Sequence, residues 1–243
     1  MNFFTFIYAQ NTANEVANAT YIARTDSTIS EGIILPAGGQ LTQPVNVNGA
    51  WNIRSFTTLG LPFGILKSNI NLNLGLNYVR SPGLINNQSN VSNTFSTNTG
   101  FVIGSNISEK VDFTIAYTAN YNIVENSIQP VLNDNYFFQT TQLKLNWIFS
   151  KGLVFRSDIS HQSYSGLNEE FNQGFFLWNM SVGKKILTKQ RGEVRMDIFD
   201  MLNQNNSISR TTSETYVEDV INQTIRQYFM ISFTYNIRNF KKA

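Results

Sequence analysis

The sequence predicts an all-β protein whose strands form an antiparallel up-and-down transmembrane β-barrel. Three observations predict this fold. Apolar and polar residues alternate within segments of about ten residues, about ten such segments follow one another, and the connections between them alternate between short and long. The segments have a period of 2 rather than 3.6, which excludes helices. They lie near 2–10, 45–59, 69–80, 93–107, 111–125, 136–149, 153–164, 173–184, 192–200 and 225–238.

The composition narrows the protein class. The chain has 243 residues, of which 42% are hydrophobic and only 14% charged, against about a quarter charged in a typical soluble domain. Its mean hydropathy is nevertheless slightly negative, at −0.19, because uncharged polar residues, chiefly Asn, Ser, Thr and Gln, take the place of the missing charged residues. Abundant aromatic residues and a low net charge argue against disorder. A net charge of +2 gives no basic footprint for nucleic acid, so no nucleic-acid partner is expected.

Several kinds of site and segment are excluded by residue type. The chain contains no Cys, which excludes disulfides and thiolate metal sites. His161 is the single histidine, so a site of several histidines is excluded as well, and no cofactor is expected. No window of about 20 apolar residues predicts a transmembrane helix. The apolar start at 1–10 lacks Lys and Arg, and we interpret it as a strand rather than a signal peptide.

Each alternating segment has two chemically different faces. In the segment 111–125, Val111, Phe113 and Ile115 alternate with Asp112 and Thr114. Successive side chains of a strand point to opposite sides of the sheet, so one face is apolar and the other polar. Charged side chains occupy the polar face in mid-strand, where a hydrated lumen accommodates them. These are Lys144, Arg156, Asp158, Glu193, Arg195 and Asp197.

The connections carry further information. Short turns are predicted at 61–64, 108–110, 150–152 and 187–192, and long loops rich in Asn, Ser and Gly near 20–44, 81–92, 126–135, 165–172 and 201–224. Short turns at one end and long loops at the other are typical of a transmembrane barrel. Strands of ten tilted residues suffice to cross a bilayer, where unpaired backbone groups are costly and the sheet has to close. A soluble β-sandwich is the alternative.

Aromatic residues on the apolar face fit the same prediction. Rings with a polar tip gather where a bilayer meets water, so some of these residues are expected to form girdles. In a sandwich they would be ordinary core. The aromatic residues concerned are Trp51, Tyr78, Tyr117, Trp147, Phe149, Trp178 and Tyr235.

A family resemblance rests on particular stretches. The run Gly192-Glu193-Val194-Arg195-Met196-Asp197-Ile198-Phe199-Asp200-Met201-Leu202-Asn203-Gln204-Asn205 resembles a strand and loop start near the C-terminus of Bacteroidota outer-membrane barrels. These belong to the TonB-dependent receptor group and its relatives. The stretch 208–238 is similar to the terminal strand of that group, and 44–49 to a loop-to-strand entry.

The resemblance implies a location, partners and an activity. The chain would lie in the cell outer membrane, with outer-membrane lipid as its surroundings. It would form the wall and external loops of a receptor that takes up an unknown small solute. In full receptors a plug gates the lumen and contacts the TonB complex. Residues 1–243 are expected to form one barrel domain, the C-terminal part of such a receptor, without its signal peptide, plug and N-terminal domains.

Alternatives from other classes remain open. A stand-alone ten-strand barrel with a structural or adhesive role is the first, and a shortened paralogue that pairs with another chain is another. A barrel hydrolase is more remote, because Asp158 and His161 fall on opposite faces of one strand. His161 and Ser163 share a face, but no third group stands behind them, as a catalytic triad requires. We therefore expect no enzymatic activity.

Acidic residues in the predicted loops raise the question of a hard cation. Glu169 and Glu170 form one group, and Glu214, Glu218 and Asp219 form another. Oxygen clusters of this kind suit Ca²⁺, but solvated loop charges are the favoured interpretation and no metal site is assigned. The sequence assigns no residue to ligand binding.

Overall fold

The computed structural model describes residues 1–30, 33–64, 67–105, 108, 110–167, 169–212 and 217–237, with the side chains at 29, 30, 170, 189 and 212 left aside. The strands are β1 (Asn2–Thr12), β2 (Glu15–Ile22), β3 (Ser27–Ser30), β4 (Ile33–Leu35), β5 (Gln40–Val47), β6 (Ala50–Phe63), β7 (Ser68–Ile85), β8 (Gln88–Ser105), β9 (Val111–Asn126), β10 (Asp134–Phe149), β11 (Leu153–Ser165), β12 (Gly174–Ile186), β13 (Gly192–Phe199), β14 (Ser207–Thr212), β15 (Val217–Asn222) and β16 (Tyr228–Tyr235). Short 3₁₀ turns are η2 (Pro130–Leu132), η3 (Ser150–Gly152), η4 (Glu169–Phe171) and η5 (Thr188–Gln190).

The protein is all-β and is built around one antiparallel up-and-down sheet, as the sequence predicts. Twelve strands belong to this sheet, and ten of them follow the order β1-β6-β7-β8-β9-β10-β11-β12-β13-β16. Strands β2 and β5 form a hairpin that joins it through a short parallel pairing between β2 and β7. The ten strands of the path correspond to the ten predicted segments. The described part of the chain contains no helix long and apolar enough to cross a membrane.

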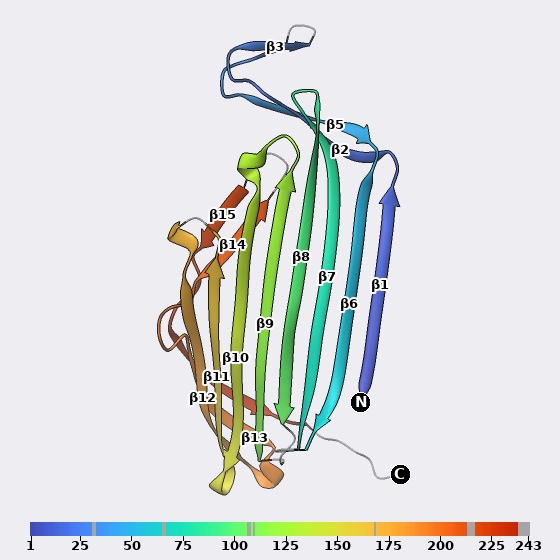
Figure 1. Cartoon of the computed structure of the whole chain (residues 1–243). Helices are drawn as coiled ribbons and strands as arrows, with labels where there is room; N and C mark the ends of the chain where they lie inside the picture. Colours follow the sequence, from blue (N-terminus) through green and yellow to red (C-terminus); the bar gives the residue numbers. More distant parts are fainter. Residues whose placement is uncertain are drawn as a thin grey trace.

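The sheet is long and curved, with different connections at its two ends (Figure 1). The connections β6–β7, β8–β9, β10–β11 and β12–β13 are short and lie at the end where β1 begins. The β1–β6 and β13–β16 connections lie at the opposite end and hold smaller hairpins, β2–β5 with β3–β4 in the first and β14–β15 in the second. The sequence missed these hairpins. The β3–β4 and β14–β15 hairpins lie within the predicted loops 20–44 and 201–224, whereas β2 and β5 extend beyond the first of these loops on both sides.

Register confirms that the two faces differ in chemistry. Lys144 of β10 pairs with Asp158 of β11 and Thr114 of β9, whereas the next row joins Leu143 to Ile159 and Ile115. We call the face that carries Lys144 the inner face, because the β14–β15 hairpin folds toward it, and the opposite face the outer face. The alternation predicted for 111–125, 143–149, 153–159 and 193–198 therefore holds in the sheet.

The sheet is a single layer with little interior. The accessible surface is 15790 Å², whereas a compact monomer of 27.6 kDa would expose about 11,000 Å². The outer face accounts for much of the excess, since its large apolar side chains are exposed. Examples are Leu74 (45%), Leu143 (46%), Trp147 (47%), Val182 (49%) and Met196 (47%). A two-layered sandwich with these residues as its core is therefore not what the chain forms.

Several predicted boundaries are wrong. The predicted turn 61–64 is mostly strand, because β6 continues to Phe63, which pairs with Ser68. The predicted loop 81–92 is strand, because β7 and β8 continue to a two-residue turn at Asn86 and Asn87. Both residues have positive φ, 48° and 64°, which Asn tolerates better than most residues. The predicted strand 45–59 is broken at its start. Residues 45–47 belong to β5, and Gly49, with φ of 89°, turns the chain into β6.

Candidate functional site

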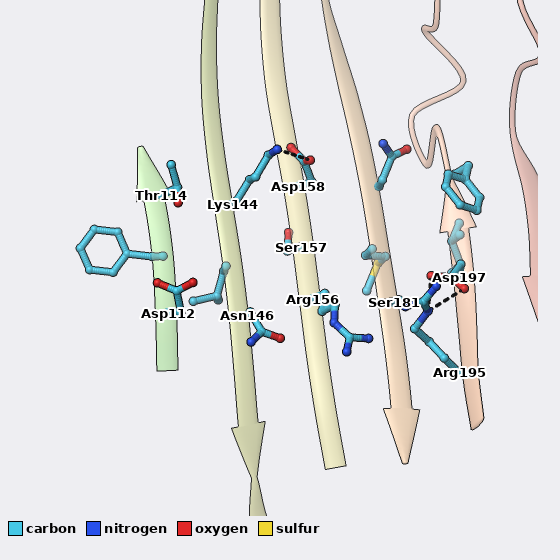
Figure 2. A pocket seen from close by; sticks show the side chains of 16 residues that line it. Asp112, Thr114, Lys144, Asn146, Arg156, Ser157, Asp158, Ser181, Arg195 and Asp197 are labelled. Carbon is cyan, nitrogen blue, oxygen red and sulfur yellow. Dashed lines mark hydrogen bonds and ion pairs between the residues drawn. The ribbon is translucent and has the colours of Figure 1, made fainter. Parts of the chain in front are cut away.

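An open hollow of about 490 Å³ lies on the inner face over β9 to β13. Neighbouring strands supply its charged walls (Figure 2). Asp112 comes from β9, Lys144 from β10, Arg156 and Asp158 from β11, and Arg195 and Asp197 from β13. Alternation brings them together, since in each strand every second side chain points to this face.

Three ion pairs cross or follow these strands. Arg156 donates to both carboxylate oxygens of Glu193, at 2.7 and 3.3 Å, over the intervening strand β12. The other pairs are Lys144 with Asp158 at 3.7 Å and Arg195 with Asp197 at 2.9 Å. Small residues of β12 leave space for the first pair, because Arg156 and Asp197 both pair in register with Ser181 and Arg195 with Gly183.

Within the pairs the cations are more exposed than the carboxylates. The side chains of Arg156 and Arg195 expose 36% and 31% of their surface, against 16% for Glu193 and 11% for Asp197. Lys144 exposes 53%. Partly exposed pairs of this kind contribute little to stability. Their chemical capacity is instead to line a hydrated wall and to contact a polar or charged solute.

The inner face is covered at the loop end by the β14–β15 hairpin. Ile208 of β14 packs with Leu167 and with Phe175 of β12, and all three are at most 8% exposed. Three half-buried aromatic residues surround them: Tyr136, Tyr164 and Phe171. By register Tyr136, Tyr164 and Phe175 point to the inner face. The connection between β13 and β16 therefore folds back over the polar face, behind β10 in Figure 1.

Arg210 fixes this hairpin. Its side chain is only 5% exposed and forms a bidentate contact with Asp219 of β15, with Nε and Nη2 at 2.7 and 2.5 Å from the two carboxylate oxygens. Its Nη1 donates to Asp134 at the start of β10 and to the carbonyl of Gly166. The hydrogen bond with the Asp219 carboxylate raises the pKa of the Arg210 guanidinium, although burial opposes the shift. One cation thus joins β14, β15, β10 and the β11–β12 connection.

Asp200 organises the start of the same connection. It is 1% exposed, and its two carboxylate oxygens accept hydrogen bonds from the backbone N–H groups of Gln204 and Asn205 at 2.9 and 3.0 Å. Its own N–H donates to the side chain of Asn179. The residues on which the family resemblance partly rests, 200–205, therefore have a structural role here. They end β13 and form the turn that leads to the hairpin.

The other residues singled out in the sequence lie as follows. Register places Trp51, Trp147, Trp178 and Tyr117 on the outer face, together with Tyr78, Phe149 and Tyr235. His161 is also on the outer face, with its ring 4.5 Å from that of Phe176, whereas Asp158 is on the inner face.

The acidic groups considered for a cation lie only partly within the described structure. Asp219 is engaged by Arg210, and Glu214 and the side chain of Glu170 lie outside the described residues. No group of three or more acidic or histidine side chains suited to a metal occurs among the residues that the structure describes. The sequence did not reveal Arg210, because its partners at 134, 166 and 219 are brought together only by the fold.

Comparisons of this chain with protein-family models, with curated proteins and with solved structures give no match.

Proposed function

We propose that the chain forms the wall and external loops of an outer-membrane β-barrel, similar to a TonB-dependent receptor, through which a small polar solute passes. One observation carries the proposal. Ten consecutive antiparallel strands expose an apolar outer face and a charged inner face, in a sheet with little core of its own. Lipid would cover the outer face, and water and solute would contact the inner face.

The two edges of the ten-strand path support a closed assembly. Strand β1 contacts β6 and strand β16 contacts β13, and along the path the direction alternates, so β1 and β16 run in opposite directions. Unpaired backbone groups cost several kcal/mol each in hydrocarbon. The edges therefore require partners, either each other in a ten-strand barrel or further strands in a larger receptor. The resemblance to TonB-dependent receptors favours the larger barrel.

The inward hairpin gives the passage a narrow zone. Because β14–β15 folds over the inner face and is held by Arg210, it reduces the opening at the loop end. Between the hairpin and the short-turn end of the sheet, a solute would meet Arg156, Arg195 and Lys144, the more exposed members of the three ion pairs. We propose that hairpin and pairs together select what passes.

Fractionation and reconstitution test the proposal. We expect an antibody against residues 217–227 to detect the native polypeptide in the outer-membrane fraction, at several times 27.6 kDa for a full receptor. A band near 27.6 kDa would indicate a self-contained small barrel, and recovery in the detergent-free soluble fraction would refute the membrane assignment. After reconstitution in a planar bilayer, channel conductance supports a passage. Silence would favour a plugged, structural or adhesive barrel.

A further inference from the structure

Charge is segregated between the two ends of the sheet. The four short connections, 64–67, 106–110, 150–152 and 187–191, contain five basic residues and one acidic residue, Glu109. The long connections at the opposite end contain nine acidic residues, three arginines and no lysine. The net charge of +2 therefore conceals a basic short-turn end and an acidic loop end.

Four lysines at the basic end are exposed in the turns or belong to the outer face of the sheet. Lys67, Lys110 and Lys151 are exposed turn residues, and Lys184 belongs to the outer face of β12, where it pairs in register with Leu153 and Val194. The ammonium of Lys184 donates to the backbone carbonyl of Lys151 at 2.5 Å, so it reaches the level of the turn. We call Lys67, Lys110, Lys151 and Lys184 the basic rim.

The basic rim has no carboxylate partner among the residues that the structure describes. None of its four lysines forms an ion pair with another described residue. The described acidic residues nearest this end are Asp112 and Glu193. Both belong to the inner face, where Asp112 accepts from Ser105 and Glu193 is held by Arg156. Within the described residues, no carboxylate neutralises these lysines, and Glu109, which neighbours Lys110 in sequence, lies outside them.

Aromatic side chains lie beside the rim on the outer face. Trp147 and Phe149 of β10 have ring centroids 5.3 Å apart and are 47% and 39% exposed. Phe149 pairs with Leu153, which pairs with Lys184, so the ring and the lysine share one row of the sheet. Tyr235 of β16 and Phe63 of β6 are also exposed at this end, at 48% and 40%. Aromatic rings followed by lysines mark the boundary between hydrocarbon and headgroups.

We propose that the basic rim binds the phosphate groups of anionic phospholipids in the leaflet at the short-turn end. This inference rests on the proposed function, because it requires the outer face to lie in a bilayer. An apolar surface directly beside the lysines suits a lipid, whose phosphate lies next to its acyl chains, better than a nucleic acid or an acidic protein. Each basic residue near an anionic surface favours binding by about fivefold.

The test uses Trp147 as a local reporter. The full chain carrying Trp51→Phe and Trp178→Phe is reconstituted in vesicles of phosphatidylcholine, and brominated phosphatidylcholine or brominated phosphatidylglycerol is added to quench the remaining tryptophan. We expect phosphatidylglycerol to bind beside Trp147 about fivefold more tightly, the contribution of one basic residue, and the preference to fall with salt. If the double variant folds poorly, the unaltered chain serves instead, and the same difference in quenching is then smaller because Trp51 and Trp178 also contribute to the fluorescence.

Matched variants distinguish lipid binding by the basic rim from an effect of the overall charge of the protein. Replacing the four rim lysines by Gln should reduce the preference to about one, whereas replacing them by Arg should retain it. The control is Arg24→Gln with Arg226→Gln, which removes exposed cations from the loop end and should leave the preference unchanged. Equal quenching by the two lipids, or a preference that survives in the Gln variant, would overturn the inference while leaving the barrel intact. Absence of quenching by either lipid would instead refute the proposed membrane location.

Discussion

At the scale of single residues, Arg210 has the largest expected effect on the inner face. Arg210→Met leaves Asp134 and Asp219 without their cation, and Asp219 is only 2% exposed. Breaking a buried ion pair by removing one partner costs about 3–5 kcal/mol. We therefore expect the β14–β15 hairpin to detach from the inner face while the ten-strand sheet remains. Hydrogen exchange within 207–222 should become faster, and limited proteolysis should cleave there first.

Arg226 provides the control for this change. It lies in the same connection but is exposed, so Arg226→Met should leave exchange in the hairpin unchanged. Arg210→Lys should give an intermediate result, because one ammonium cannot reproduce the two parallel hydrogen bonds to Asp219. Equal protection of the hairpin in Arg210→Met and the unaltered chain would show that its apolar contacts alone hold it.

Residue-level prediction succeeded where the pattern is local. Parity along a strand places Lys144, Arg156 and Asp197 on the inner face, and the register confirms it. It failed for Arg210 and Asp200, whose roles depend on partners outside strand alternation. Asp200 receives backbone N–H groups of the turn that follows it, and Arg210 joins residues up to 76 positions away in sequence. The alternation of apolar and polar residues along a strand carries no information about such contacts.

At the scale of elements, the tip of the β7–β8 hairpin anchors the β2–β5 hairpin. The side chain of Asn86 accepts from the N–H of Ile22 at 2.8 Å and donates to its carbonyl at 3.3 Å. Asn86→Gly retains the positive φ of the turn but removes both contacts. We expect the amide of Ile22 to exchange about fivefold faster, since a hydrogen bond contributes about 1 kcal/mol net. Amides of β7 and β8 should keep their protection, and their loss would mean that the turn itself had failed.

Strand ends were harder to predict than strands because turn-forming residues also occur inside strands. Pro82 and Gly83 belong to the predicted loop 81–92, yet they pair with Val91 and Asn90. Beyond Arg80 strand β7 has lost its β6 partner, and a strand edge tolerates a residue without an N–H group. The hairpins β2–β5 and β14–β15 were missed because their sequences are short and polar, and their pairing depends on contacts with the main sheet.

At the scale of the whole molecule, the sheet leaves its apolar outer face without a covering layer. The accessible surface of 15790 Å² exceeds the roughly 11,000 Å² of a compact monomer, and apolar patches beyond a few hundred Å² mark lipid or protein contacts.

Without an amphiphile the chain should therefore associate. In detergent micelles it should sediment as a discrete particle that carries bound detergent. Analytical ultracentrifugation with density matching of the detergent measures both quantities. A monodisperse, detergent-free monomer would show that the outer face does not need an amphiphile to cover it, which would contradict the barrel. Bound detergent in a discrete particle would place the exposed leucines and aromatic residues of the outer face against hydrocarbon, as the barrel requires.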